Sequence, residues 1–152
     1  MKKKILFVSL LVSILLMSCS SAATNDSSLG KGKTMALKFV TNPSTGFDWE
    51  YKFLDGDDKG ALHLDREDYN TIGSPDLMGA SSERTYYFVA DKAGKQSLTF
   101  TYRRPWEGGE VLYDVVYELN IDKDLNIICL SKSKGVVESK EELSFFPDPT
   151  FE

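Results

Sequence analysis

The chain has 152 residues and a formal net charge of −5 at pH 7, from 18 Lys and Arg residues against 23 Asp and Glu residues. This length suits one domain with a targeting segment. The acidic balance and the lack of a basic stretch with interleaved aromatic residues disfavour nucleic acid and anionic lipid surfaces as partners, so we expect no nucleic acid partner.

The N-terminus has the layout of a secretory signal. Three lysines precede the apolar run Ile5–Met17, which has 13 residues, whereas a membrane-spanning helix needs ~20. The run ends in Leu-Met-Ser-Cys, which resembles a bacterial lipobox. This resemblance implies cleavage after residue 18, lipid attachment to Cys19, and anchoring in the bacterial cell envelope on the periplasmic or external face of a membrane. The alternatives are an ordinary signal peptide with a chance cysteine, or an uncleaved anchor.

The segment 19–33 that follows is small, polar and Gly-containing, which predicts a flexible tether behind the lipidated cysteine. Removal of residues 1–18 leaves 15 Lys and Arg residues against 23 Asp and Glu residues, a net charge of about −8. If Cys19 carries lipid, Cys129 has no partner for an intramolecular disulfide. It lies in an apolar run, so we expect a small buried core residue.

Apolar residues recur with period two from residue 34 to residue 130, which predicts β-strands rather than helices. The expected strands are 34–41, 49–53, a short segment around His63, 84–90, 97–103, 111–121 and 125–130. Turn-forming residues separate them at short intervals. The pattern predicts an all-β domain, an immunoglobulin-like antiparallel β-sandwich of about seven to eight strands over residues 34–130. A small closed barrel is the alternative.

The C-terminal extension, residues 131–152, is less regular. Ser139 and Glu142 have the spacing of a capping box, which allows a short helix. The stretch Phe-Phe-Pro-Asp-Pro-Thr-Phe that follows is apolar and interrupted by proline. It either packs along a sheet edge or stays loose.

Catalytic and metal-binding patterns are weak. A Cys/His nucleophile pair would require His63 with Cys129, no Gly-x-Ser-x-Gly motif occurs, and no further residue is identified as an orienting group. The acidic stretch 55–60 resembles part of a calcium loop, but Lys59 and Arg66 would occupy ligand positions. We therefore expect no enzyme, no catalytic residues, no metal and no cofactor.

Three loops between the predicted strands have unusual compositions. They contain Asn42, Pro43, Ser44, Thr45, Gly46 and Phe47; then Gly79, Ala80, Ser81 and Ser82; then Arg104, Pro105 and Trp106. Proline and glycine fix the first loop, while Trp106 either folds back onto the sandwich or anchors an interface. Because alternate loops of such a sandwich meet at one end, the three loops predict a binding edge on a rigid frame.

The order of these motifs resembles the chagasin-like inhibitors of papain-family cysteine peptidases, over about residues 34–121. The Asn-Pro-x-Thr-Gly-aromatic and Arg-Pro-Trp motifs match, whereas Ser81 and Ser82 replace two glycines of the second motif. The resemblance implies that the Thr45 loop covers the catalytic Cys of the enzyme. It also implies that the second loop lies along one side of the cleft and that Trp106 packs opposite, with Arg104 making polar contacts. If both serines needed positive φ, each would cost about 1 kcal/mol or more, so we expect a changed backbone there or a narrower range of targets.

The leading hypothesis is therefore a lipid-anchored, monomeric and reversible inhibitor of papain-like cysteine peptidases. The alternatives are a ligand-binding or adhesion lipoprotein that uses the same loop edge for glycan or protein, and a purely structural envelope protein.

Overall fold

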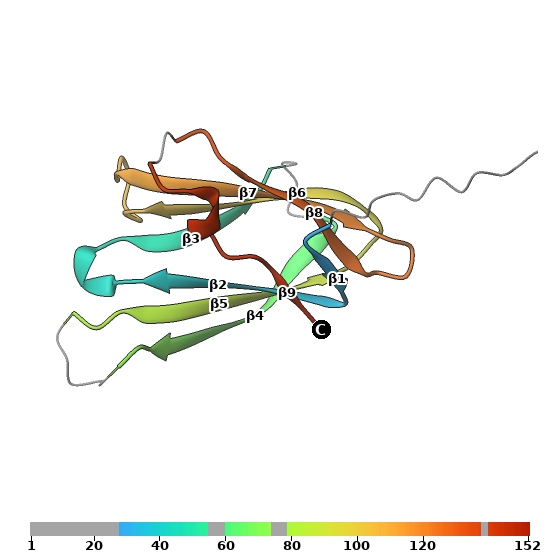
Figure 1. The fold of residues 1–152 in the computed structure, drawn as a ribbon, viewed down its shortest axis with the longest axis horizontal. Helices are drawn as coiled ribbons and strands as arrows, with labels where there is room; N and C mark the ends of the chain where they lie inside the picture. Colours follow the sequence, from blue (N-terminus) through green and yellow to red (C-terminus); the bar gives the residue numbers. More distant parts are fainter. Residues whose placement is uncertain (1–27, 55–59, 74–78, 138–139) are drawn as a thin grey trace, which may run out of the picture.

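The computed structural model describes residues 28–54, 60–73, 79–137 and 140–152 (Figure 1). The predicted signal peptide, Cys19 and the first part of the predicted tether lie outside these ranges, as does most of the acidic stretch 55–60. Within them, no helix has the length and apolar character needed to cross a membrane.

The described residues form two antiparallel sheets packed face to face (Figure 1). The first sheet has the order β1 (Gly30–Gly32), β8 (Ile127–Lys134), β7 (Val111–Ile121), β6 (Gly94–Arg103) and β3 (Asp48–Phe53). The second has the order β4 (Leu62–Thr71), β5 (Ser82–Ala90), β2 (Thr34–Thr41) and β9 (Thr150–Phe151). Two short 3-10 turns, η1 (Pro43–Thr45) and η2 (Leu143–Phe145), complete the elements.

The predicted all-β sandwich is confirmed, and the closed barrel is excluded because the described strands form two separate sheets. The described residues hold nine strands, so the expected count of seven to eight is too low. The shortfall comes from β1 and β9, which have three and two residues and are too short to show a period.

Aromatic side chains from both sheets fill the core. Phe39 of β2 packs on Trp49 of β3 and on Phe100 of β6, with ring centroids 4.3 and 4.4 Å apart. Tyr86 of β5 donates a hydrogen bond from its hydroxyl to the Trp49 carbonyl at 2.7 Å, and burial raises the pKa of that hydroxyl above its ordinary value. Alternation along the strands thus places the predicted apolar face inside, with Cys129 buried among the same residues, as predicted.

The sandwich begins earlier than the composition predicts. Gly30–Gly32 lies within the predicted tether but pairs with β8, opposite Cys129, Ile128 and Ile127. The two glycines of β1 permit this because a Cβ on Gly30 would lie 2.5 Å from the Phe151 ring, and one on Gly32 would lie 2.7 Å from the Phe151 Cβ. The C-terminal strand therefore covers the N-terminal one.

The C-terminal extension is part of the fold. Strand β8 continues to Lys134, and the apolar stretch after η2 packs along the sandwich, with Phe146 fully buried. Of the two expectations for this stretch, packing along a sheet edge is confirmed, because β9 pairs with β2. The short helix that the capping-box spacing allowed is a single 3-10 turn at Leu143–Phe145. Glu142 precedes this turn without a side-chain cap, and Ser139 lies outside the described residues.

Candidate functional site

The three loops lie at one end of the sandwich. The first loop (residues 42–47) joins β2 to β3, the second (79–82) leads into β5, and the third (104–106) lies in the hairpin between β6 and β7. Figure 1 shows all three at the same end, opposite the turns that lead into β6 and β8. We call the described residues of these loops the binding edge.

Local hydrogen bonds fix the first loop. The Asn42 Oδ1 accepts from the Ser44 N–H at 3.1 Å and from the Ser44 hydroxyl at 2.6 Å. The Asn42 carbonyl accepts from the Thr45 N–H at 3.0 Å and from the Thr45 hydroxyl at 2.7 Å. Gly46 then takes a φ of 74°, which ends the 3-10 turn. The two hydroxyls shape the turn, while Pro43, Ser44 and Thr45 remain exposed at its tip.

The backbone of the second loop lacks the strain that positive φ angles at both serines would cause. Gly79 has a φ of 81°, whereas Leu125 is the only non-glycine residue with positive φ in the described part of the chain. Ser81 and Ser82 thus carry no left-handed strain. Ser82 is the first residue of β5 and is only 3% exposed, so its side chain offers little surface to a partner. The backbone returns to the extended conformation before this position, and the sheet then buries the side chain.

The third loop is a tight turn that presents an indole. The Gly109 N–H donates to the Trp106 carbonyl at 2.9 Å, and the Arg104 N–H donates to the Glu110 carbonyl at 3.0 Å. Gly109 is required because a Cβ there would lie 2.1 Å from the Arg104 carbonyl oxygen. Trp106 is 52% exposed and therefore does not fold into the core. Its ring lies beside the first loop, 3.4 Å from the position of a Cβ on Gly46.

Side-chain contacts join the three loops to one another. The Asn42 Nδ2 donates to the Gly79 carbonyl at 3.3 Å, which links the first loop to the second. The Arg104 guanidinium lies 4.7 Å from the centre of the buried Phe47 ring and 5.5 Å from that of Trp106, which links the third loop to the first. Phe47 supports its loop from below. The half-buried Arg104 lies near both rings, and its Nε is buried without a hydrogen-bond partner, whereas its predicted polar contacts with a peptidase stay a prediction.

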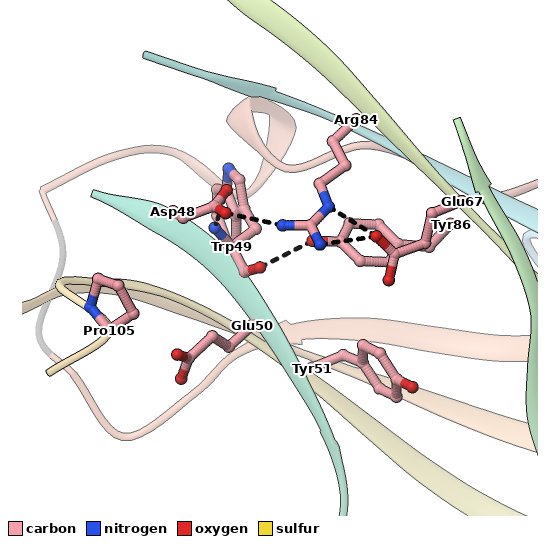
Figure 2. A pocket seen from close by; sticks show the side chains of 8 residues that line it. All are labelled: Asp48, Trp49, Glu50, Tyr51, Glu67, Arg84, Tyr86 and Pro105. Carbon is pink, nitrogen blue, oxygen red and sulfur yellow. Dashed lines mark hydrogen bonds and ion pairs between the residues drawn. The ribbon is translucent and has the colours of Figure 1, made fainter. Parts of the chain in front are cut away.

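An ion-pair bridge beside the binding edge has no counterpart in the sequence predictions. Figure 2 shows Arg84 of β5 between Asp48 of β3 and Glu67 of β4, at a hollow of about 400 Å³ that Pro105 also lines. The Arg84 Nη1 lies 2.7 Å from an Asp48 carboxylate oxygen, and its Nη2 lies 2.6 Å from a Glu67 carboxylate oxygen. Burial lowers the pKa of Arg84, but hydrogen bonding to Glu67 and the nearby negative charges outweigh it and raise the pKa overall.

This bridge connects the strand after the first loop with the strand after the second. Asp48 directly follows Phe47, and Arg84 lies two residues beyond Ser82. The bridge therefore joins β3 of the first sheet to β4 and β5 of the second, next to the loops. In the sequence, these three residues are charged residues of the kind found on any exposed strand face. Nothing in their spacing predicts that they come together.

The described residues keep the candidate Cys/His pair apart and form no metal-binding group. His63 lies exposed on β4, with its Nδ1 2.8 Å from an Asp91 carboxylate oxygen, whereas Cys129 is buried on β8 in the other sheet. Burial raises the pKa of the Cys129 thiol to about 11, so it is protonated at neutral pH. No group of three or more His, Cys, Asp and Glu side chains is placed to hold a metal ion in the described ranges.

Comparison with known proteins matches the part of the chain that contains the three loops. Residues 28–121 match the chagasin family of peptidase inhibitors, designated I42. Chagasin from Trypanosoma cruzi is 29% identical over 83 residues, covering 51% of this chain and 70% of that protein. The crystal structure of the cysteine protease inhibitor EhICP2 from Entamoeba histolytica superposes with a TM-score of 0.50 and 25% identity, covering 60% of this chain and 80% of that one. The family match spans all three loops, and the chain therefore belongs to the chagasin family of peptidase inhibitors, not to a family of enzymes.

Proposed function

We propose that this protein inhibits papain-like cysteine peptidases by inserting the binding edge into the active-site cleft as a reversible plug. The observation that carries this proposal is the set of contacts between the loops, which hold the exposed tip Pro43–Thr45 beside the exposed Trp106. A surface already fixed in one shape loses little conformational entropy on binding.

We assign different roles to the residues of the edge on the basis of their exposure. Ser44 and Thr45 form the small, exposed tip that enters the cleft over the catalytic Cys of the enzyme. The second loop contributes backbone at Gly79–Ser81, and Trp106 packs against the opposite wall. Ser82 and Phe47 are buried, and Arg104 stacks on Phe47, so these three residues support the contact surface from within.

A titration tests this proposal. Residues 20–152, which include all described strands, should abolish papain activity stoichiometrically and reversibly. Trp106→Ala should dissociate ~10- to 100-fold faster, as expected for a loss of ~1.4–3 kcal/mol at an aromatic anchor. No inhibition across several papain-like enzymes would refute the proposal. A glycan that quenched Trp106 fluorescence in the same preparation would then favour the adhesion alternative.

We further propose that the protein is a monomer anchored to the cell envelope by a lipid on Cys19. The position of β1 is compatible with this arrangement. Gly30, the first residue of β1, pairs with Cys129, the third residue of β8, and β8 begins at the end of the sandwich away from the binding edge. The loops would then point away from the membrane, towards a peptidase.

The anchor gives a separate prediction. Cys19→Ser should move the protein from the membrane fraction to the aqueous fraction, and mass spectrometry should find acyl chains on Cys19 of the unaltered protein only. One acyl chain gives marginal membrane binding, whereas two or three give stable anchoring. Equal partition of the two proteins would contradict lipid attachment at this residue, without bearing on inhibition.

A further inference from the structure

The C-terminal strap, which we define as residues 143–148, lies outside the region that matches the family. Three contacts hold it against the sandwich. The Tyr117 hydroxyl donates to the Pro147 carbonyl at 2.7 Å, while the Lys132 ammonium donates to the Phe146 carbonyl at 2.8 Å and to an Asp148 carboxylate oxygen at 2.6 Å. Figure 1 shows η2 of the strap crossing the side of the sandwich between the two sheets. The strap is thus a fixed part of the domain.

A ladder of aromatic rings runs from the strap to the first loop. Phe145 packs on Tyr113 of β7 at 5.4 Å, and Tyr113 stacks on Tyr102 of β6 at 5.9 Å with an interplanar angle of 9°. Tyr102 in turn stacks on Phe47 at 5.5 Å, and Arg104 lies over the same Phe47 ring. Each of these contacts joins residues of two different elements. A continuous series of side-chain contacts therefore connects the strap to both the first and the third loop.

A second route leads to the same loops. Phe146, next to Phe145, contacts Trp49 edge to face at 6.4 Å. The Trp49 indole N–H donates to the carbonyl of Val40 at 3.0 Å, two residues before Asn42. Trp49 also packs on Tyr102 at 5.0 Å. Side-chain contacts therefore connect both strap phenylalanines to the base of the first loop. These contacts reach it through Val40 of β2 and Tyr102 of β6.

We propose that the strap positions the binding edge and that Phe145 is a positioning residue for the first and third loops. Its ring is 52% exposed, so its removal opens little cavity and should lower the overall stability only slightly. Removal does free one face of Tyr113, and an aromatic pair is worth about 0.5–1.5 kcal/mol beyond burial. The consequence for inhibition rests on the proposed function, whereas the ordering of the loops does not.

Three variants of the full-length chain test the proposal. Phe145→Ala removes the first ring of the ladder, Phe145→Tyr keeps it, and Val136→Ala is the control at a 96% exposed position of the same extension. One readout is amide hydrogen exchange at Thr45, Gly46 and Phe47, whose N–H groups are all hydrogen-bonded within the first loop. The other readout is the association and dissociation rates with papain, together with Tm.

We expect Phe145→Ala to speed exchange at these three amides by about 2- to 13-fold, the factor that corresponds to the loss of the Tyr113 contact, which is the one of its two ring contacts that belongs to the ladder. The dissociation rate should rise by a similar factor. The association rate should stay within about twofold, because changes within one interface act mainly on dissociation. Phe145→Tyr and Val136→Ala should match the unaltered protein in both readouts.

Unchanged loop exchange in Phe145→Ala would overturn the proposal. If dissociation were faster with unchanged exchange, Phe145 would touch the peptidase directly, which also overturns it. Equal acceleration at Leu119 in the core of β7 would mean global destabilisation and would overturn it as well. Faster exchange confined to the loops, in a protein that inhibits no peptidase, would support positioning and refute only the proposed function.

Discussion

Thr45→Arg is expected to weaken inhibition of a papain-like peptidase by about 100-fold or more, which corresponds to ~3 kcal/mol. Thr45 lies at the exposed tip of the first loop, and its small side chain is turned back onto the Asn42 carbonyl at 2.7 Å. Arginine cannot form that hydrogen bond as the threonine hydroxyl does. It also adds a long charged side chain at the tip that, in the proposed function, enters the narrow cleft of the peptidase. The inhibition constant from papain titration measures the effect.

Thr45→Ala separates the two causes. It removes the hydroxyl without adding bulk, so the hydrogen bond to the Asn42 carbonyl and the one from the Phe47 N–H are lost, each worth about 0.5–1.5 kcal/mol, and inhibition should weaken less than in Thr45→Arg. Ser131→Arg adds the same charge at an exposed position of β8 and should leave inhibition unchanged. If Thr45→Arg inhibited as well as the unaltered protein, the first loop could not be the plug.

Phe146→Ala is expected to lower the free energy of unfolding by about 3–5 kcal/mol, as is typical of a large buried ring reduced to a methyl group. Phe146 is 1% exposed and contacts both Trp49 and Tyr113, although it lies outside the region shared with the family. Domains of this kind are stable by about 5–15 kcal/mol, so the loss is a large fraction of the total. Urea denaturation followed by tryptophan fluorescence measures it.

The neighbouring residue supplies the control. Phe145→Ala removes the same atoms from a ring that is half exposed, so it should cost about 1 kcal/mol or less. Similar losses at the two positions would mean that the strap does not pack as described. A full loss at Phe146 alone would establish that the extension completes the core.

Period-two alternation predicted the strands well where one face of the strand is buried. The observed bounds of β2 and β7 equal the predicted ranges 34–41 and 111–121. Strand β4 runs to Thr71, far beyond the short segment expected around His63. It lies at a sheet edge, most of its side chains are exposed, and a bulge falls between Leu64 and Arg66. Without a buried face, no alternation marks such a strand.

The loops could be located from their own composition, because proline, glycine and small polar residues act locally. The contacts that support the loops could not be predicted from composition. The stacking of Arg104 on Phe47, the burial of Ser82 and the bridge from Arg84 to Asp48 and Glu67 all depend on which strands become neighbours. Sequence spacing carries no signal for contacts across 36 or 57 residues.

By itself the sequence determined the fold class, the three loop motifs and the absence of an obvious catalytic constellation, because periodicity and turn chemistry are properties of short segments. Only the tertiary structure decided which loop residues face outward and that the extension after β8 belongs to the domain. The physical reason is that burial and ring stacking arise between segments distant along the chain. Phe151 against Gly30 and Phe146 against Trp49 are such contacts, and they form only once both sheets are in place.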